Sequence, residues 1–188
     1  KSCETRVGRD DLPEPLASLE GLEELKPAFR NAGSVTAGNA SGLNDGSCAL
    51  LLASEKGVKA LGTNPLTRVI CGASVGVEPR TMGIGPVLAS EKALKMSGLK
   101  LGQMDLIEIN EAFSAQVLSC TRSMGLEDKD PRINPNGGAI SLGHPLGMTG
   151  ARLALTASKE LVRSRGKYAL VTMCVGVGQG FAVILERQ

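Results

Sequence analysis

The sequence predicts an α/β domain with a mixed, mostly parallel sheet and helices on both faces. The main observation is that, from residue 46 onward, short apolar runs rich in β-branched residues alternate with segments of helical periodicity. A second is that 42% of the 188 residues are hydrophobic, which is enough to build a core. A third is that the chain has 24 glycines, three Phe, one Tyr and no Trp, so we expect aliphatic packing and many tight turns.

Each element of this domain follows from a local pattern. Strands are predicted over residues 47–53, 68–77, 104–109, 167–174 and 181–187, and helices over residues 54–61, 85–97, 111–124 and 145–163. Ser54 and Gly62 are typical of the start and end of the first helix, and Pro86 and Gly98 of the second. We expect residues 1–45 to be an irregular segment with a short helix between residues 16 and 25, and residues 46–188 to form the domain.

Two stretches allow more than one interpretation. Tyr168–Leu185 carries no charge over 18 residues, as a membrane helix would. Glycines in its middle and β-branched residues on both sides favour two buried strands joined by a turn. Residues 125–144 form a long Pro- and Gly-rich loop, and loops of this length in compact domains are usually functional or disordered. Because residues from Ile133 onward are small and mostly uncharged, we expect a packed, functional loop.

Charge and cysteine content exclude several classes of protein. The net charge of +2, from 21 basic and 19 acidic residues, gives no strong attraction to nucleic acid or to an anionic membrane. The five cysteines are scattered and form no CxxC pair, so we expect free thiols in a reducing compartment, either the cytoplasm or a reducing organelle matrix. A single histidine leaves little for a metal site. Because the chain begins without Met and without a signal peptide, we expect it to be a segment of something longer.

Three polar side chains follow predicted strands or precede a predicted helix: Asn110, His144 and Cys174. An amide, an imidazole and a thiol can therefore converge at one edge of the sheet. Pro145 holds His144 in an extended conformation and suits the first helical turn, so the helix dipole is expected to disfavour an imidazolium. A neutral imidazole held in this way can donate an N–H to a developing oxyanion, although a lone histidine is more often structural.

The other residues of these segments leave alternatives open. Asn110 either binds a carbonyl oxygen or a water, or caps the following helix. Glu111 is expected to be structural, in the first turn of that helix. Phe113 packs in the core or lines a pocket. Cys174 is a nucleophile, a base or a buried small hydrophobe, and the glycine-rich turn behind it offers backbone N–H groups for an oxyanion.

Four segments together carry a resemblance. They are NEAF at residues 110–113, GHPLG at 143–147, CVGVGQG at 174–180 and, upstream, VTAGNASGLNDG at 35–46. In this order they resemble the C-terminal half of the thiolase family, over essentially the whole chain. The resemblance implies a half of the family's layered αβαβα fold. It also implies Claisen condensation or thiolysis of 3-oxoacyl-CoA thioesters, assembly as dimers or tetramers, and no cofactor beyond the CoA thioester that is the substrate.

The resemblance also implies roles for individual residues. Asn110 would hold a catalytic water that forms an oxyanion hole with His144, and His144 would help to activate the nucleophilic cysteine. Cys174 would move the α-proton as base and acid, and the backbone N–H of Gly176 would contribute to a second oxyanion hole. The residues that match the coenzyme A site are Phe29, Ala37 and Ser41, toward the pantetheine or adenine end, and Met82, Ala112 and Phe113, along the acyl and pantetheine tunnel.

One departure from the family pattern concerns the acyl-accepting cysteine, which lies in the family's N-terminal half. Cys3, Cys48, Cys71 and Cys120 show no activating neighbour in the sequence, so we expect the chain alone to be catalytically incomplete and to need that N-terminal half as a partner. The motif forms favour degradative thiolases, such as those acting on 3-oxoacyl-CoA or 3-oxoadipyl-CoA. The alternative is a non-catalytic module for CoA binding or dimerisation.

Overall fold

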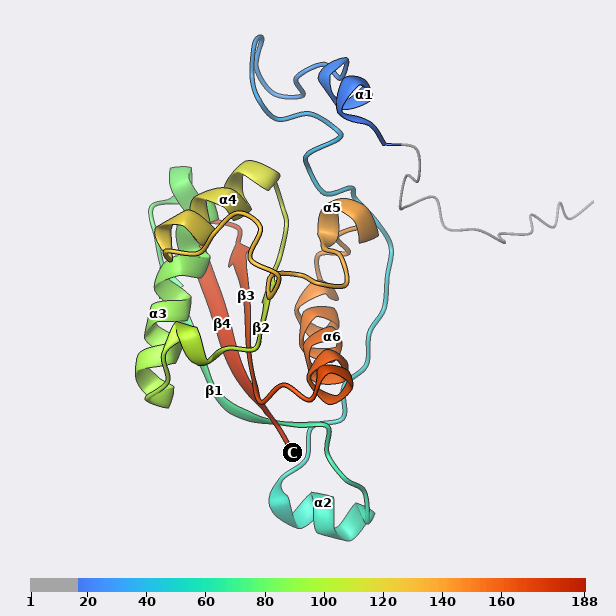
Figure 1. The fold of residues 1–188 in the computed structure, drawn as a ribbon, viewed down its shortest axis with the longest axis vertical. Coiled ribbons are helices and arrows are strands. Elements are labelled where there is room, and N and C mark those ends of the chain that lie inside the picture. The colour runs from blue at the N-terminus through green and yellow to red at the C-terminus, as the bar shows by residue number, and fades with distance from the viewer. Residues whose placement is uncertain (1–16) are drawn as a thin grey trace, which may run out of the picture.

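The computed structural model describes residues 17–188, which form a four-stranded sheet with helices on both faces (Figure 1). The predicted class, a mixed α/β sheet with helices, is confirmed. The elements in chain order are α1 (Leu19–Glu23), α2 (Glu55–Leu61), β1 (Thr67–Gly76), η1 (Pro79–Ile84), α3 (Gly85–Ser97), η2 (Leu101–Gln103), β2 (Leu106–Ile109), α4 (Ser114–Ser123), α5 (Ala139–Leu142), α6 (Thr149–Ser164), β3 (Tyr168–Val175) and β4 (Gln179–Arg187).

The sheet has the strand order β1-β4-β3-β2, and only the β2–β3 pair is parallel. Strand β4 pairs antiparallel with both β1 and β3. Three strands therefore share one direction, as predicted, but the sheet is not mostly parallel in its pairings. The reason is that β4 turns back directly after β3 and inserts between β3 and β1, so the single reversed strand is central and forms two of the three pairs.

The uncharged stretch near the C-terminus forms the β3–β4 hairpin, as the glycine-turn interpretation predicts. Within it, Tyr168 pairs with Glu186 at the open end and Val175 with Gln179 at the turn. Among residues 17–188, no helix combines the length and apolar character needed to cross a membrane. The uncharged sequence is therefore explained by strands that are buried between two layers of helices.

Two hydrophobic clusters hold the helices against the sheet. One cluster packs α3 on one face, and its buried members include Ala89, Ala93, Ile107, Leu170 and Ile184. The other packs α6 on the opposite face, with Leu106, Leu153, Ala157, Leu161 and Leu185. Alternate residues of β2 point to opposite clusters, which is the two-residue periodicity of a strand covered on both sides. This packing fixes where β2 and β3 end, and the candidate site begins there.

Local signals predicted the limits of α2 and α3 correctly. The Ser54 hydroxyl accepts a hydrogen bond from Gly57 N at 3.2 Å, so it caps α2. Gly62 ends α2 with φ 61° and Gly98 ends α3 with φ 70°, both in the left-handed region where glycine is favoured. The short helix predicted over residues 16–25 corresponds to α1, although residue 16 lies outside the described residues.

The strand predicted over residues 47–53 is wrong. This segment has no regular secondary structure and pairs with no strand among the described residues. Leu50, Leu51 and Leu52 are 42%, 80% and 78% exposed. An apolar run becomes a strand only where a neighbouring strand accepts its hydrogen bonds, and none of the four strands pairs with this segment.

Two predicted helices begin later in the chain than expected. Helix α4 begins at Ser114 because Phe113 is extended and forms a bridge with Ala40. Helix α6 begins at Thr149, because Pro145 opens a turn in which its carbonyl accepts hydrogen bonds from Met148 N and Thr149 N. The residues ahead of both helices thus belong to the site rather than to the helices.

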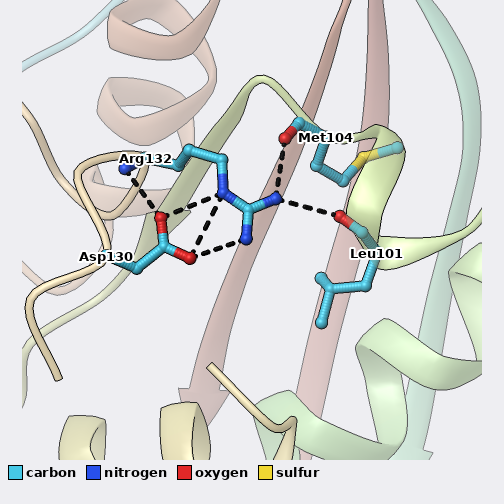
Figure 2. A network of polar contacts seen from close by, with 4 residues as sticks. All are labelled: Leu101, Met104, Asp130 and Arg132. Carbon is cyan, nitrogen blue, oxygen red and sulfur yellow. Dashed lines mark hydrogen bonds and ion pairs between the residues drawn. The ribbon is translucent and has the colours of Figure 1, made fainter. Parts of the chain in front are cut away.

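The side chain of Arg132 attaches the long loop to the segment before β2 (Figure 2). The Arg132 guanidinium donates to the carbonyls of Leu101 and Met104 at 3.3 and 3.0 Å and binds the Asp130 carboxylate. The backbone carbonyl of Arg132 accepts a hydrogen bond from Ile107 N at 2.8 Å. This network ties the loop to the edge of β2, so the loop is packed as predicted, with the short helix α5 inside it.

Candidate active site

Asn110 and His144 meet at the end of β2. The amide Nδ2 of Asn110 lies 3.3 Å from Nε2 of His144, and the two residues are 1% and 9% exposed. Strand β2 positions Asn110, whose backbone N–H donates to the Thr172 carbonyl on β3 at 3.0 Å. The predicted convergence of an amide and an imidazole at one edge of the sheet is therefore present for this pair.

The second ring nitrogen of His144 is held by Thr149, at the start of α6. His144 Nδ1 lies 2.8 Å from the Thr149 hydroxyl, which in turn donates to the Pro145 carbonyl at 2.9 Å. Since the single hydroxyl proton goes to Pro145, the oxygen accepts a hydrogen bond from the Nδ1–H of His144. This arrangement leaves Nε2 as the unprotonated nitrogen that faces Asn110.

Burial and charge keep the His144 ring neutral. Desolvation lowers the pKa of His144, and the positive charge of Arg152 on α6 lowers it further. The expected cause, a helix start at Pro145, is wrong, because α6 begins five residues after His144. The resting imidazole is therefore a proton acceptor at Nε2, and it becomes an N–H donor there only after it takes up a proton.

Asn110 keeps one polar atom without a protein partner. Its Oδ1 is buried and makes no hydrogen bond within residues 17–188. A buried carbonyl oxygen of this kind costs free energy unless a water or a ligand group donates to it. Asn110 therefore suits a residue that fixes a water or a polar substrate group beside His144.

Cys174 lies near the end of β3, at the same edge of the sheet as Asn110, because β2 and β3 run parallel. The side chain is buried, and desolvation raises the pKa of its thiol. Within the described part of the chain, Cys174 makes no hydrogen bond to Asn110 or His144. The structure thus joins the amide and the imidazole directly and places the thiol at their edge of the sheet.

The turn after Cys174 depends on its glycines. Gly178 has φ 88°, and a Cβ there would lie 2.4 Å from the carbonyl oxygen of Val77. A Cβ on Gly180 would lie 2.1 Å from the carbonyl oxygen of Gly85. Gly176 is exposed in this turn, and the glycines behind it let the turn lie directly on the chain before α3.

The upstream small-residue segment lies along the chain that follows Asn110. Ser41 donates to the Ala112 carbonyl from its backbone N–H at 3.1 Å and from its hydroxyl at 3.3 Å. The ring centroids of Phe29 and Phe113 are 6.2 Å apart in an edge-to-face contact. Four of the residues assigned to coenzyme A, namely Phe29, Ser41, Ala112 and Phe113, therefore gather in one place.

Within the described residues, no hydrogen bond, strand pairing or ring contact joins the other two predicted coenzyme A residues, Ala37 and Met82, to this group. Ala37 is in an exposed turn, and Met82 is half-buried in η1. Within residues 17–188, no strand pairing or hydrogen bond joins either residue to Asn110 or His144. Their assignment rests on the resemblance alone and stays a prediction.

Two residues of the site, Asn44 and Thr149, escaped the sequence analysis, and a third, Glu111, was expected in a helix. Asn44 Oδ1 accepts a hydrogen bond from the backbone N–H of His144 at 3.1 Å, and Thr149 holds the imidazole. Glu111 lies outside α4, contrary to expectation, and binds the loop before His144. Thr149 lies four residues after Pro145, which is one helical turn. This spacing is the only local signal in the sequence for any of the three residues.

An open hollow of about 420 Å³ lies beside the turn that follows His144. Its walls are the segments 44–48 and 145–148, together with Ala151. Among residues 17–188, no group of three or more His, Cys, Asp or Glu side chains is arranged to hold a metal ion. The site pair itself can accept a proton at His144 Nε2 and hold a water or a polar group at Asn110 Oδ1.

Two family profiles match the chain. The profile described as "Thiolase, C-terminal domain" matches residues 63–187, and "Thiolase, N-terminal domain" matches residues 1–56. The site pair Asn110 and His144 and the thiol of Cys174 all lie in the first of these ranges. The boundary between residues 45 and 46 stays a prediction.

Curated relatives are similar along the whole chain. The "3-oxoadipyl-CoA/3-oxo-5,6-dehydrosuberyl-CoA thiolase" of Escherichia coli is 56% identical over 187 residues, which is 100% of this chain and 47% of that protein. An "acetyl-CoA acetyltransferase" of Pseudomonas aeruginosa is 51% identical over 95% of this chain and 45% of that protein. The chain thus spans about half the length of the curated relatives it matches.

Solved structures share the fold. The acetyl-CoA acetyltransferase of Bacillus anthracis superposes with a TM-score of 0.92 at 44% identity, over 96% of this chain and 45% of that one. Human mitochondrial 3-ketoacyl-CoA thiolase superposes with a TM-score of 0.88 at 45% identity, over 95% of this chain and 45% of that one.

Proposed function

This chain belongs to the thiolase family. We propose that it carries part of the catalytic site, namely Asn110, His144 and Cys174, of an acyltransferase acting between 3-oxoacyl-CoA and CoA. The observation that carries the proposal is the buried pair of Asn110 and His144, with the Nε2 lone pair of a neutral imidazole beside an amide. A module that only binds CoA has no need for a fixed imidazole tautomer in a desolvated position.

In the cleavage direction, His144 Nε2 takes the proton of an attacking cysteine thiol, and the thiolate adds to the 3-oxo carbon of the substrate. The resulting imidazolium then has an N–H at Nε2, which donates to the thioester oxygen as the bond between C2 and C3 breaks and an enolate forms. A water held by Asn110 is the second donor. Each such donor contributes a few kcal/mol to the stability of an enolate in a dry site.

Cys174 supplies the proton that completes this step. Burial raises the pKa of its thiol, so the thiol holds its proton at neutral pH, as an acid must. Transfer of that proton to the enolate carbon releases the acetyl thioester and leaves a Cys174 thiolate. The Cys174 thiolate then accepts the proton of the incoming CoA thiol, which attacks the acyl-enzyme while the backbone N–H of Gly176 faces the acyl oxygen. As the acyl–cysteine bond breaks, the released cysteine thiolate takes its proton back from the His144 imidazolium, so both groups return to their starting states.

The attacking cysteine is assigned to the N-terminal half of the family fold. Burial raises the pKa of Cys71, and it raises the pKa of Cys120 to about 11, so neither is an activated nucleophile. Cys48 is half-buried in the hollow beside Pro145, where no basic side chain among the lining residues activates it. Cys3 lies outside the described residues.

The proposal extends to substrate and assembly. Its substrates are CoA thioesters of 3-oxo acids, with 3-oxoadipyl-CoA as the first to try because the Escherichia coli relative is named for it. Its partners are the N-terminal half and a second copy of the whole enzyme in a dimer or tetramer. No cofactor other than the CoA thioester takes part, and free thiols are consistent with a reducing compartment, namely the cytoplasm or a reducing organelle matrix.

A hybrid chain tests the proposal. The N-terminal part of the Escherichia coli relative is joined to this chain, and thiolysis of 3-oxoadipyl-CoA is followed as the loss of the substrate's enolate absorbance. We expect activity in the hybrid, none in the chain alone, and a loss of at least about a hundredfold in His144→Ala and Cys174→Ala. Lys159→Ala, at an exposed position of α6, is the control. Full activity in both site variants leaves only the CoA-binding or dimerisation role.

A further inference from the structure

The Glu111 carboxylate binds the loop that leads to His144. Its Oε1 accepts a hydrogen bond from Asn134 Nδ2 at 2.8 Å, and its Oε2 accepts one from Ile140 N at 3.1 Å. Ile140 lies in the first turn of α5, which has no side-chain cap from its own N-cap residue, Gly138. The carboxylate of Glu111 therefore takes the place of a cap for this helix.

Asn134 extends the attachment back to β2. Its Oδ1 accepts from Ile109 N and its Nδ2 donates to the Ile109 carbonyl, both at 2.9 Å. The side chain of Asn134 thus pairs with the last residue of β2 as a neighbouring strand would. One amide nitrogen, Asn134 Nδ2, contacts both the end of β2 and the Glu111 carboxylate.

The fit around the carboxylate is close. A Cβ added to Gly138 would lie 2.1 Å from the carboxyl carbon of Glu111, so the carboxylate could not keep this position beside a larger residue. From Ile140 the chain reaches His144 in four residues, through α5 and Gly143. Glu111 directly follows Asn110 in the chain. Its side chain therefore links the backbone segment that carries Asn110 to the segment that carries His144.

We propose that Glu111 is a positioning residue that sets Asn110 against His144 by anchoring α5 to the end of β2. Its catalytic meaning rests on the proposed function, because the pair it positions is the one assigned to the oxyanion hole. Glu111 itself makes no hydrogen bond to either side chain of the pair within the described part of the chain. It acts through Asn134 and Ile140 and is not a catalytic residue.

Glu111→Gln tests the proposal in the chain without any substrate. A glutamine offers one oxygen to two N–H donors and sets its own NH2 against the other, so one of the two hydrogen bonds is lost. Because the chain has one histidine, NMR signals of the imidazole belong to His144 without assignment work. We expect the nuclear Overhauser contact between the Asn110 amide and the His144 ring to weaken, and exchange of the Ile140 amide to quicken at least about tenfold.

The controls separate positioning from general stability. Glu127→Gln, an exposed glutamate in the same loop, keeps both signals unchanged. Glu111→Asp keeps the charge but is one methylene shorter, so it shows the same losses and serves if Glu111→Gln does not fold. In the active hybrid, we expect Glu111→Gln to lower kcat with little change in KM. An Asn110–His144 contact and an Ile140 exchange rate that match the parent chain in a folded variant overturn the proposal. These NMR results stand whether or not the hybrid turns over a thioester.

Discussion

The Nε2 atom of His144 lies 3.3 Å from the Nδ2 atom of Asn110, although 34 positions separate the two residues in the sequence. Two different attachments produce this contact. Pairing of β2 with β3 fixes Asn110, and the turn at Pro145 together with Thr149 fixes the imidazole. The site is therefore preorganised by backbone and side-chain hydrogen bonds before any ligand binds, which is the condition for electrostatic stabilisation of an oxyanion.

Thr149→Val tests the tautomer of His144. Valine has the shape of threonine but no acceptor for Nδ1–H, so we expect the proton to move to Nε2, where the rotated Asn110 amide can accept it. The 15N chemical shifts of the single imidazole should change from those of the Nδ1–H form toward those of the Nε2–H form. Loss of the buried hydrogen bond should also lower the free energy of unfolding by about 1–2 kcal/mol.

Thr156→Val is the matched control on the same helix, since the Thr156 side chain makes no hydrogen bond within residues 17–188. It should leave the imidazole shifts unchanged. A Thr149→Val chain whose ring nitrogens keep the parent shifts contradicts the assignment of Thr149 as the acceptor.

Glu108 predicts an unusual dependence of stability on pH. It is fully buried on β2, and desolvation raises its pKa from an ordinary value of 4.5 to about 7, against the opposing charge of Arg152. As the pH rises from about 4.5 to 7, the unfolded chain releases this proton before the folded chain does, so the free energy of unfolding falls. Relative to Glu108→Gln, which cannot titrate, we expect the parent to lose about 3 kcal/mol over this window.

Urea unfolding of both chains at several pH values measures this difference. Because the comparison is between slopes, it does not depend on the absolute cost of the substitution. Glu91→Gln, at an exposed position of α3, should follow the parent curve. Parallel curves for the parent and Glu108→Gln show that Glu108 keeps an ordinary pKa.

The elements that the sequence predicted best are those with signals at both ends. Ser54 with Gly62 and Pro86 with Gly98 define α2 and α3 because capping depends on the few residues around each end. The central position of β4 and the unpaired segment 47–53 were not predictable in this way. Both depend on which strands lie side by side, and pairing partners far along the chain leave no local pattern.

The same division holds for the candidate site. Asn110 and His144 were predicted because a polar residue directly after a strand, or before a proline, stands out in the sequence. Glu111 was predicted to lie in a helix, since an acidic residue near a helix start usually complements the dipole. Its actual partners are Asn134, in the long loop, and Ile140, in the short helix α5 within that loop, and only tertiary packing determines the course of this loop.

The Asp130–Arg132 pair predicts sensitivity to acid. The carboxylate is 12% exposed and accepts hydrogen bonds from Arg132, which lower the pKa of Asp130. At neutral pH, Asp130→Asn should reduce the free energy of unfolding by about 1–3 kcal/mol, because a charge-assisted hydrogen bond is lost and the guanidinium keeps its orientation less well. Since the folded pKa is depressed, the parent loses this contribution as the pH falls below 3.8 through the folded pKa, and the two chains converge.

The exposed pair of Arg122 and Asp128 provides the comparison, measured by denaturant unfolding at pH 7 and pH 2.5. Its side chains are 63% and 45% exposed, so Asp128→Asn should change stability little. An Asp130→Asn chain as stable as the parent at pH 7 shows that the network in Figure 2 does not stabilise the loop.

Val177 stores strain in the turn after β3. It has φ 67°, in the left-handed region that β-branched residues rarely adopt, and its side chain is 85% exposed. Asparagine tolerates this conformation, so Val177→Asn should raise the free energy of unfolding by about 1 kcal/mol, seen as a higher melting temperature. Val175→Asn, in the extended strand before the turn, should instead lower it. A lower melting temperature for Val177→Asn contradicts the assignment of strain to this residue.

The leucines of the unpaired segment predict association of the isolated chain. Leu51 and Leu52 lie next to each other and are largely exposed, and contiguous apolar surface of this kind favours contact with another protein surface. We expect sedimentation velocity to show concentration-dependent association of the parent chain and a marked reduction in the variant with Leu51→Lys and Leu52→Lys. Leu61→Lys, an isolated exposed leucine at the end of α2, should leave association unchanged, because single exposed leucines are ordinary on protein surfaces. A parent chain that stays monomeric at high concentration shows that this segment needs no covering partner, and it weakens the case for an N-terminal half packed against it.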